Sequence, residues 1–185
     1  LVTFAYDGLM TVKLTVHEPT DAITFHARDL NIASGIVLDA DGVERTNPGG
    51  PDVLYGDEGQ ETATVALAVP FTEKDVGSTV TLTVKFTGEL NDKLAGFYRS
   101  AYPAPENPEE TRYLAVTQFE PTDARRCFPC WDEPSLKATF QMTLTVPENR
   151  VALSNMPEAT VVKDAAAKTK TVTFETTPVM STYLL

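Results

Sequence analysis

The chain has 185 residues, of which 42% are hydrophobic and 22% are charged. This composition is typical of a globular domain with a real core, and it excludes a disordered tail, a collagen-like fibre and a small disulfide-stapled scaffold. The formal net charge of -11 argues against nucleic acid or an anionic membrane as a partner. No apolar run approaches the ~20 residues that a membrane-spanning helix needs.

Polar and apolar residues alternate with a period of two through most of the chain, which predicts short β-strands. These runs consist largely of Thr and Val, which suit a half-buried pleated surface. In chain order the predicted strands are 9–16, 22–25, 32–38, 62–69, 80–87, 97–102, 113–119, 139–146, 151–153 and 171–175. A short helical turn is predicted at 122–126, with Thr122 or Asp123 as its cap.

Many short strands separated by turn residues predict an all-β sandwich. Two polar segments, 47–59 and 103–110, are predicted to be exposed loops, and neither is long enough to separate two domains. The sequence therefore predicts one sandwich domain over residues 1–185. The chain stops at Leu185 inside an apolar, strand-like stretch, which would expose apolar surface and unpaired backbone groups. We therefore expect a piece of a longer polypeptide.

Residues 17–21, His-Glu-Pro-Thr-Asp, come close to the His-Glu-x-x-His zinc motif. That motif needs a helix, so that two imidazoles one turn apart reach the same metal. Here Asp21 stands in place of the second histidine, and Pro19 follows a β-patterned run, so a turn is predicted instead. His26 is the only other histidine. We expect no metal site in this chain.

Cys127 and Cys130 form a Cys-x-x-Cys pair. A thioredoxin-like redox pair begins a helix after a βαβ pattern, and a zinc site would need two further ligands close by. The sequence provides neither, so we expect two reduced thiols, at least one of them buried. A redox protein remains an alternative. The absence of an N-glycosylation sequon favours an intracellular location.

Charged residues alternate densely on both sides of the two cysteines. Asp123, Arg125 and Arg126 precede the first cysteine, and Asp132 and Glu133 follow the second. Structural pairing within one loop is the favoured interpretation. A contact with substrate is the alternative, if this loop borders a cleft.

Gln118 and Glu120 share one face of a predicted strand, because alternation turns Phe119 to the other face. Pro121 ends the strand pairing and leaves Glu120 at a strand exit, where binding sites are commonly built. A carboxylate beside an amide can bind a small cationic or amide group. Composition alone favours a solvated strand edge.

The continuous string at residues 115–134 is Ala-Val-Thr-Gln-Phe-Glu-Pro-Thr-Asp-Ala-Arg-Arg-Cys-Phe-Pro-Cys-Trp-Asp-Glu-Pro. It resembles the signature of the N-terminal domain of M1-family zinc aminopeptidases, and is most similar to the puromycin-sensitive branch. Segments 88–100, 150–155 and 177–183 agree with this resemblance. It is strong over residues 80–185, whereas the earlier part agrees only in strand pattern. Cys127 departs from the small apolar residue that is more usual in this branch.

The resemblance implies a saddle-shaped β-sandwich ahead of a zinc-binding catalytic domain, against which the sandwich packs. The Gly-Ala-Met-Glu-Asn and His-Glu-x-x-His motifs of that domain do not occur in this chain. The chain alone is therefore expected to be inactive, with zinc held elsewhere in a cytoplasmic parent enzyme.

By the same resemblance, Glu120 binds the free α-amine of a peptide substrate, and Gln118 lines the pocket for its first side chain. The Glu120–Pro121 peptide bond is expected to be cis. The alternative is a stand-alone β-sandwich that binds a ligand through its loops, and the length of the signature string argues against it.

Overall fold

The computed structural model describes residues 3–47, 53–56 and 59–185. Strands dominate this part of the chain, and its three helical segments are 3₁₀ turns of three residues each. The strands are β1 (Ala5–Thr15), β2 (Thr20–His26), β3 (Leu30–Leu38), β4 (Val53–Tyr55), β5 (Thr62–Phe71), β6 (Thr79–Glu89), β7 (Gly96–Ala104), β8 (Asn107–Gln118), β9 (Thr143–Pro147), β10 (Glu158–Asp164) and β11 (Thr169–Phe174). The predicted all-β class is confirmed.

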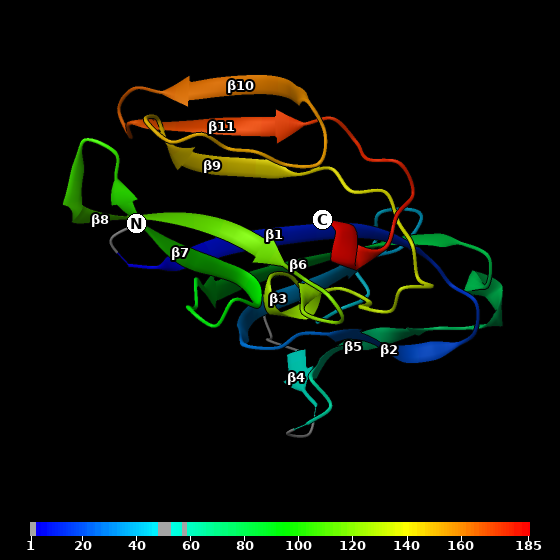
Figure 1. The fold of residues 1–185 in the computed structure, drawn as a ribbon. Coiled ribbons are helices and arrows are strands. Elements are labelled where there is room, and N and C mark those ends of the chain that lie inside the picture. The colour runs from blue at the N-terminus through cyan, green and yellow to red at the C-terminus, as the bar shows by residue number, and fades with distance from the viewer. Residues whose placement is uncertain (1–2, 48–52, 57–58) are drawn as a thin grey trace. The chain divides into compact units, whose positions relative to one another are not determined.

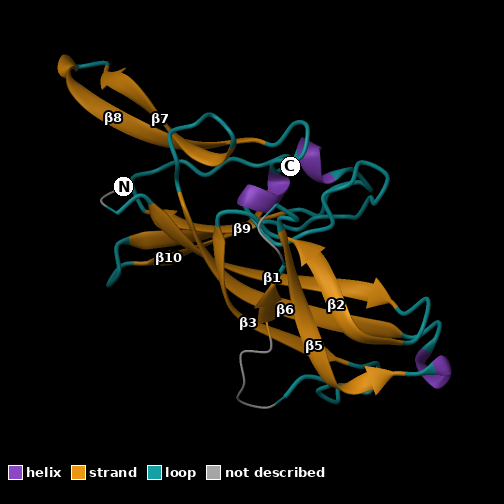
Figure 2. Cartoon of the chain, turned by 90° about the horizontal axis from the view of Figure 1, so that it is seen from below, coloured by secondary structure: helices purple, strands orange, loops and turns teal. Residues whose placement is uncertain are grey.

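The chain forms two compact units, Leu1–Asp132 and Glu133–Leu185, called here the N-terminal and the C-terminal unit. The N-terminal unit contains two three-stranded antiparallel sheets, β1-β6-β3 and β2-β5-β4, together with the β7–β8 hairpin (Figures 1 and 2). The C-terminal unit contains the antiparallel sheet β10-β11-β9. The prediction of a single domain over both units, and of its saddle shape, stays a prediction.

The core of the N-terminal unit lies between its two three-stranded sheets. Val80, Leu82, Val84 and Phe86 alternate along β6 and are all buried. They belong to the same apolar cluster as the buried residues of β5 in the other sheet. The period-two pattern thus gives each sheet one apolar face, and the two faces bury each other as a sandwich.

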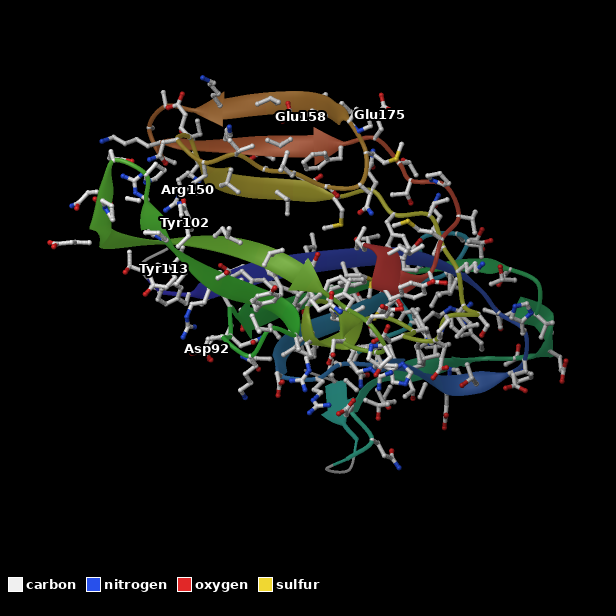
Figure 3. The ribbon with its side chains drawn as sticks, viewed as in Figure 1. Asp92, Tyr102, Tyr113, Arg150, Glu158 and Glu175 are labelled. Atoms are coloured by element: carbon white, nitrogen blue, oxygen red, sulfur yellow. The ribbon has the colours of Figure 1, made fainter. Side chains whose placement is uncertain are left out.

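The β7–β8 hairpin includes residues 103–110, which the sequence predicts to be an exposed loop. Residues 103–110 are mostly exposed, but both strands run through them, with a register shift between Pro103 and Ala104. Because this sheet has only two strands, proline can sit on an open edge where no partner needs its missing N–H. Tyr102 on β7 and Tyr113 on β8 mark the two strands in Figure 3.

Three further predictions of elements differ from the structure. The strand expected at 151–153 is absent from the described chain, although Ala152 is buried between exposed Val151 and Leu153. Strand β10 was not predicted, because all of its residues are exposed and no period-two signal arises. Strand β4 falls within the predicted loop 47–59, part of which lies outside the described residues.

Leu82→Ala tests the sandwich core. Leu82 is 0% exposed in the central strand of its sheet, so we expect this truncation to lower the free energy of unfolding by about 2–5 kcal/mol. Leu9→Ala is the matched control, because Leu9 lies on the neighbouring strand β1 and is 70% exposed. We expect it to change stability by no more than ~0.5 kcal/mol in denaturant titrations. Equal effects of the two truncations would contradict this core.

Candidate functional site

Gln118 and Glu120 are both exposed where β8 ends, and Phe119 between them is 2% exposed. This is the division between faces that strand alternation predicts. Neither polar side chain has a hydrogen bond or an ion pair to any described residue, so both are open to a ligand. The peptide bond between Glu120 and Pro121 is cis, the isomer expected from the resemblance.

Phe119 fixes the start of the segment that comes after β8, residues 119–132, called here the site loop. Its ring packs edge-on against Phe128, with ring centroids 6.1 Å apart. The backbone N–H of Asp123 donates to the Phe119 carbonyl over 2.8 Å, which closes a turn around Glu120. The exposed carboxylate is thus held between a buried aromatic anchor and a hydrogen-bonded turn.

The predicted helical turn is present as the 3₁₀ helix η2 (Ala124–Arg126). Asp123 occupies the N-cap position, but its side chain makes no capping bond, so the predicted capping is wrong. Its carboxylate instead accepts a hydrogen bond from Arg126 Nε at 2.7 Å. A hydrogen bond from the charged guanidinium is stronger than one from a backbone N–H. The Asp123 carboxylate therefore binds Arg126 and does not cap the helix.

Arg125 and Asp132 form an ion pair in the interior, with Arg125 8% and Asp132 1% exposed. Arg125 Nε donates to Asp132 Oδ2 over 3.1 Å, and the other side of the guanidinium donates to the Asp132 carbonyl over 3.2 Å. Arg125 Nη1 also reaches Glu61 Oε2 at 3.2 Å. Structural pairing, the favoured interpretation of these charges, is confirmed. Glu61 was missed because it lies far away in the sequence.

His26 connects the end of β2 to the site loop. Its backbone N–H donates to the Cys130 carbonyl over 2.8 Å, and the Cys130 N–H donates back over 3.1 Å. The Asp132 N–H donates to His26 Nδ1 over 3.1 Å, so this nitrogen is the unprotonated one. The histidine therefore has a structural role in the loop, which sequence reasoning did not find.

Both cysteines are free thiols inside the site loop. Burial raises the pKa of the Cys127 thiol to about 12, and burial likewise raises the pKa of Cys130 well above its ordinary range. A redox pair needs a thiol that ionises near neutral pH, because the thiolate is the nucleophile. The expectation of two reduced thiols with at least one buried is confirmed, and the redox alternative loses its support.

The donor set of the described residues does not fit a zinc ion. No group of three or more His, Cys, Asp or Glu side chains within the described ranges is arranged to hold a metal. His17 lies outside any helix, in the region between β1 and β2 where the sequence predicts a turn. Among the described residues, no helix is long and apolar enough to cross a membrane.

The structure is a β-sandwich that exposes an amide at the end of β8 and a carboxylate on the site loop that follows it. The chain belongs to the Peptidase M1 N-terminal domain family, whose model matches residues 1–184. It is 43% identical to Aminopeptidase M1-A of Oryza sativa subsp. japonica over 182 residues, which are 98% of this chain and 20% of the relative.

Two other relatives come from animals. Puromycin-sensitive aminopeptidase of Caenorhabditis elegans is 41% identical over 186 residues, covering 98% of this chain and 18% of the relative. Aminopeptidase N of Bos taurus is 40% identical, covering 98% of this chain and 19% of the relative. The chain thus spans about a fifth of the length of these aminopeptidases. The family expected from the signature string is confirmed, and a stand-alone binding module is not favoured.

Asp132→Ala tests the buried ion pair. It leaves the Arg125 guanidinium in the interior without its main partner, so we expect a loss of about 3–5 kcal/mol in the free energy of unfolding. The control is Asp92→Ala, which removes a carboxylate 69% exposed and 3.0 Å from Arg99 (Figure 3). We expect this surface change to cost less than ~1 kcal/mol in the same denaturant titration.

A double replacement separates charge from packing at this pair. Arg125→Met with Asp132→Leu removes both charges and keeps apolar volume, so we expect it to be more stable than Asp132→Ala alone. If the single and double variants were equally unstable, the unpaired guanidinium would not be the cause.

Thiol reactivity tests the raised pKa of the buried Cys130 and of the half-buried Cys127. A thiol with a pKa of about 12 is roughly 0.01% ionised at pH 8, so we expect the folded chain to react with iodoacetamide over a hundred times more slowly than the chain unfolded in urea. The folded-state rate should rise with pH up to about 12, because the thiolate is the reacting form. Fast labelling of either cysteine in the folded chain at pH 8 would show that the pKa of that thiol is not raised.

Proposed function

We propose that this chain is the N-terminal domain of a zinc-dependent aminopeptidase, in which Glu120 binds the free α-amine of the peptide substrate. The observation that carries the proposal is the exposed Gln118–Glu120 pair, fixed at the exit of β8 in a chain of the Peptidase M1 N-terminal domain family. Its relatives are named as aminopeptidases, which supports the same reaction class.

The chemistry of an exposed carboxylate suits this task. A peptide α-amine has a pKa of about 7.7–8.0 and is largely protonated at neutral pH, so it presents three N–H donors on a cation. A carboxylate is a pure acceptor and forms charge-assisted hydrogen bonds with such a group, each contributing about 1.5–3 kcal/mol. Glu120 has no internal partner to give up when it binds the amine.

Gln118 provides the second part of the proposed recognition. It lies on the same side of the chain as Glu120, two residues earlier, and lines the place of the substrate's first side chain. Its amide both donates and accepts hydrogen bonds, so it can contact a substrate side chain that carries either a donor or an acceptor. Glu120 thus sets where the peptide begins, and Gln118 contacts the first side chain of that peptide.

The remaining parts of the enzyme belong to the rest of a longer protein. We assign zinc and the groups that cleave the peptide bond to a catalytic domain against which this domain packs, and we expect the 185-residue chain alone to be inactive. Two free thiols and the absence of sequons support a cytoplasmic location.

Glu120→Gln tests the proposal in the longer protein that contains this chain. The substitution keeps the shape of the side chain and removes its charge, so we expect kcat/KM for peptides with a free N-terminus to fall by roughly 10- to 100-fold. The control is Glu109→Gln, which removes an exposed carboxylate from the same strand β8 and should change kcat/KM less than twofold. Folding and zinc content should match the unmodified enzyme.

The pH dependence of this loss identifies the amine as the group that Glu120 binds. The substrate amine loses its charge as the pH rises through about 7.7–8.0, so the advantage of glutamate over glutamine should shrink above that range. Normal cleavage by the Glu120→Gln variant at pH 7 would refute the proposal.

A further inference from the structure

We infer that the hydroxyl of Tyr6 positions Glu120 for substrate binding, by fixing the loop that carries it. This inference rests on the proposed function, since it assigns a positioning residue to the same recognition site. Tyr6 lies on β1, at the opposite end of the N-terminal unit's sequence from the site loop. Nothing in its local sequence pattern distinguishes it from other inward-facing residues of that strand.

The Tyr6 hydroxyl donates to the backbone of the site loop across about 120 residues of sequence. Its oxygen lies 2.9 Å from the Cys127 carbonyl and 3.3 Å from the Arg126 carbonyl. Both carbonyls belong to the end of η2, where a helix leaves acceptors without intrahelical partners. A side-chain donor from another strand therefore satisfies the end of this short helix.

The position of the Tyr6 ring is itself closely determined. It packs edge-on against Phe86, with centroids 6.4 Å apart, and against Phe97, with centroids 5.1 Å apart. Gly88 leaves the space that the end of the ring occupies, since a Cβ at that position would come within 2.3 Å of the hydroxyl oxygen. Burial raises the pKa of the Tyr6 hydroxyl, so it keeps its proton and remains a donor.

A short chain of backbone hydrogen bonds leads from this contact to Glu120. The Cys127 N–H donates to the Ala124 carbonyl over 2.8 Å, and the Arg126 N–H donates to Asp123 over 3.1 Å. The Asp123 N–H in turn donates to the Phe119 carbonyl over 2.8 Å and closes the turn that contains Glu120. A donor that fixes the end of η2 therefore also limits the motion of the carboxylate.

Other contacts hold the same loop. The Arg28 backbone N–H donates to the Arg125 carbonyl within η2 over 2.9 Å, and the remaining contacts act through side chains of the loop or at its far end. The Arg125–Asp132 ion pair and the Cys130–His26 bridge lie after η2 or across it. Tyr6 alone among the described tyrosines reaches the η2 carbonyls. Removing its hydroxyl deletes this contact and leaves the ring packing in place, which makes it a mild and specific perturbation.

The test is a double-mutant cycle between Tyr6→Phe and Glu120→Gln in the longer protein that contains this chain. We expect Tyr6→Phe to lower kcat/KM for a free-amine dipeptide by roughly three- to tenfold. The effect should come mainly from a higher KM, because the amine is bound equally in the ground state and in the transition state. In the Glu120→Gln background the same substitution should change kcat/KM less than twofold, because the group it positions is gone.

The matched control is Tyr98→Phe. Tyr98 lies on β7, and its hydroxyl has no hydrogen bond to a described residue, so we expect kcat/KM to stay within twofold. Thermal unfolding of all variants separates a general loss of folded protein from a loss of positioning. A smaller fraction of folded enzyme would lower the apparent kcat without changing KM.

Each outcome of the cycle decides a different point. If Tyr6→Phe left kcat/KM unchanged, or lowered it equally in both backgrounds, the positioning role would be overturned while amine binding by Glu120 still stood. If Glu120→Gln itself had no effect, the proposed function would fail and the inference with it. The expected pattern is a roughly three- to tenfold effect of Tyr6→Phe when Glu120 is present and less than twofold when it is replaced. This pattern supports both amine binding by Glu120 and its positioning by Tyr6.

Discussion

The ion pair between Arg125 and Asp132 is the constraint on which the site depends. Fourteen residues of largely irregular backbone come after β8, and the part from Ala124 to Asp132 is buried or half-buried, so its polar groups need partners. Burying two charges is costly, and the cost is offset only when the remaining donors and acceptors are satisfied. Here the guanidinium reaches the Asp132 carboxylate, the Asp132 carbonyl and Glu61, so one arginine ties two parts of the loop to each other and to the residue that precedes β5. The pair thereby joins the two ends of the segment 125–132 to each other and to Glu61.

The loop is fixed to both sheets of the sandwich as well as to itself. Tyr6 reaches it from β1 in one sheet, and His26 reaches it from the end of β2 in the other. A short polar segment held from two sides of a packed core has little freedom, although loops are in general the mobile part of a domain. The strands therefore provide rigid points of attachment for the loop, and the exposed Glu120 keeps its place without a partner of its own.

How much of this could be read from the sequence depends on the distance over which each contact acts. The period-two pattern indicates the strands and the opposite faces of Phe119 and Glu120, because alternation is a local property of the chain. Charge pairing within the loop could also be expected, since Arg125 and Asp132 are seven residues apart. The contact of Tyr6 joins residues 121 positions apart, and no local pattern encodes such a meeting. β10 escaped prediction for a different reason, since it buries no face at all.

The signature string divides into residues that build the loop and residues that it presents. Phe119, Arg125, Cys130 and Asp132 are buried, while Gln118 and Glu120 are exposed. In this division the buried Cys130 and the half-buried Cys127 act as small apolar side chains, because a thiol with a raised pKa offers little reactivity and packs well. Such a role explains why Cys127 can stand where a small apolar residue is more usual. The buried residues of the string thus hold the loop in place, while the exposed Glu120 is held through its buried neighbour Phe119 and the turn that Asp123 closes.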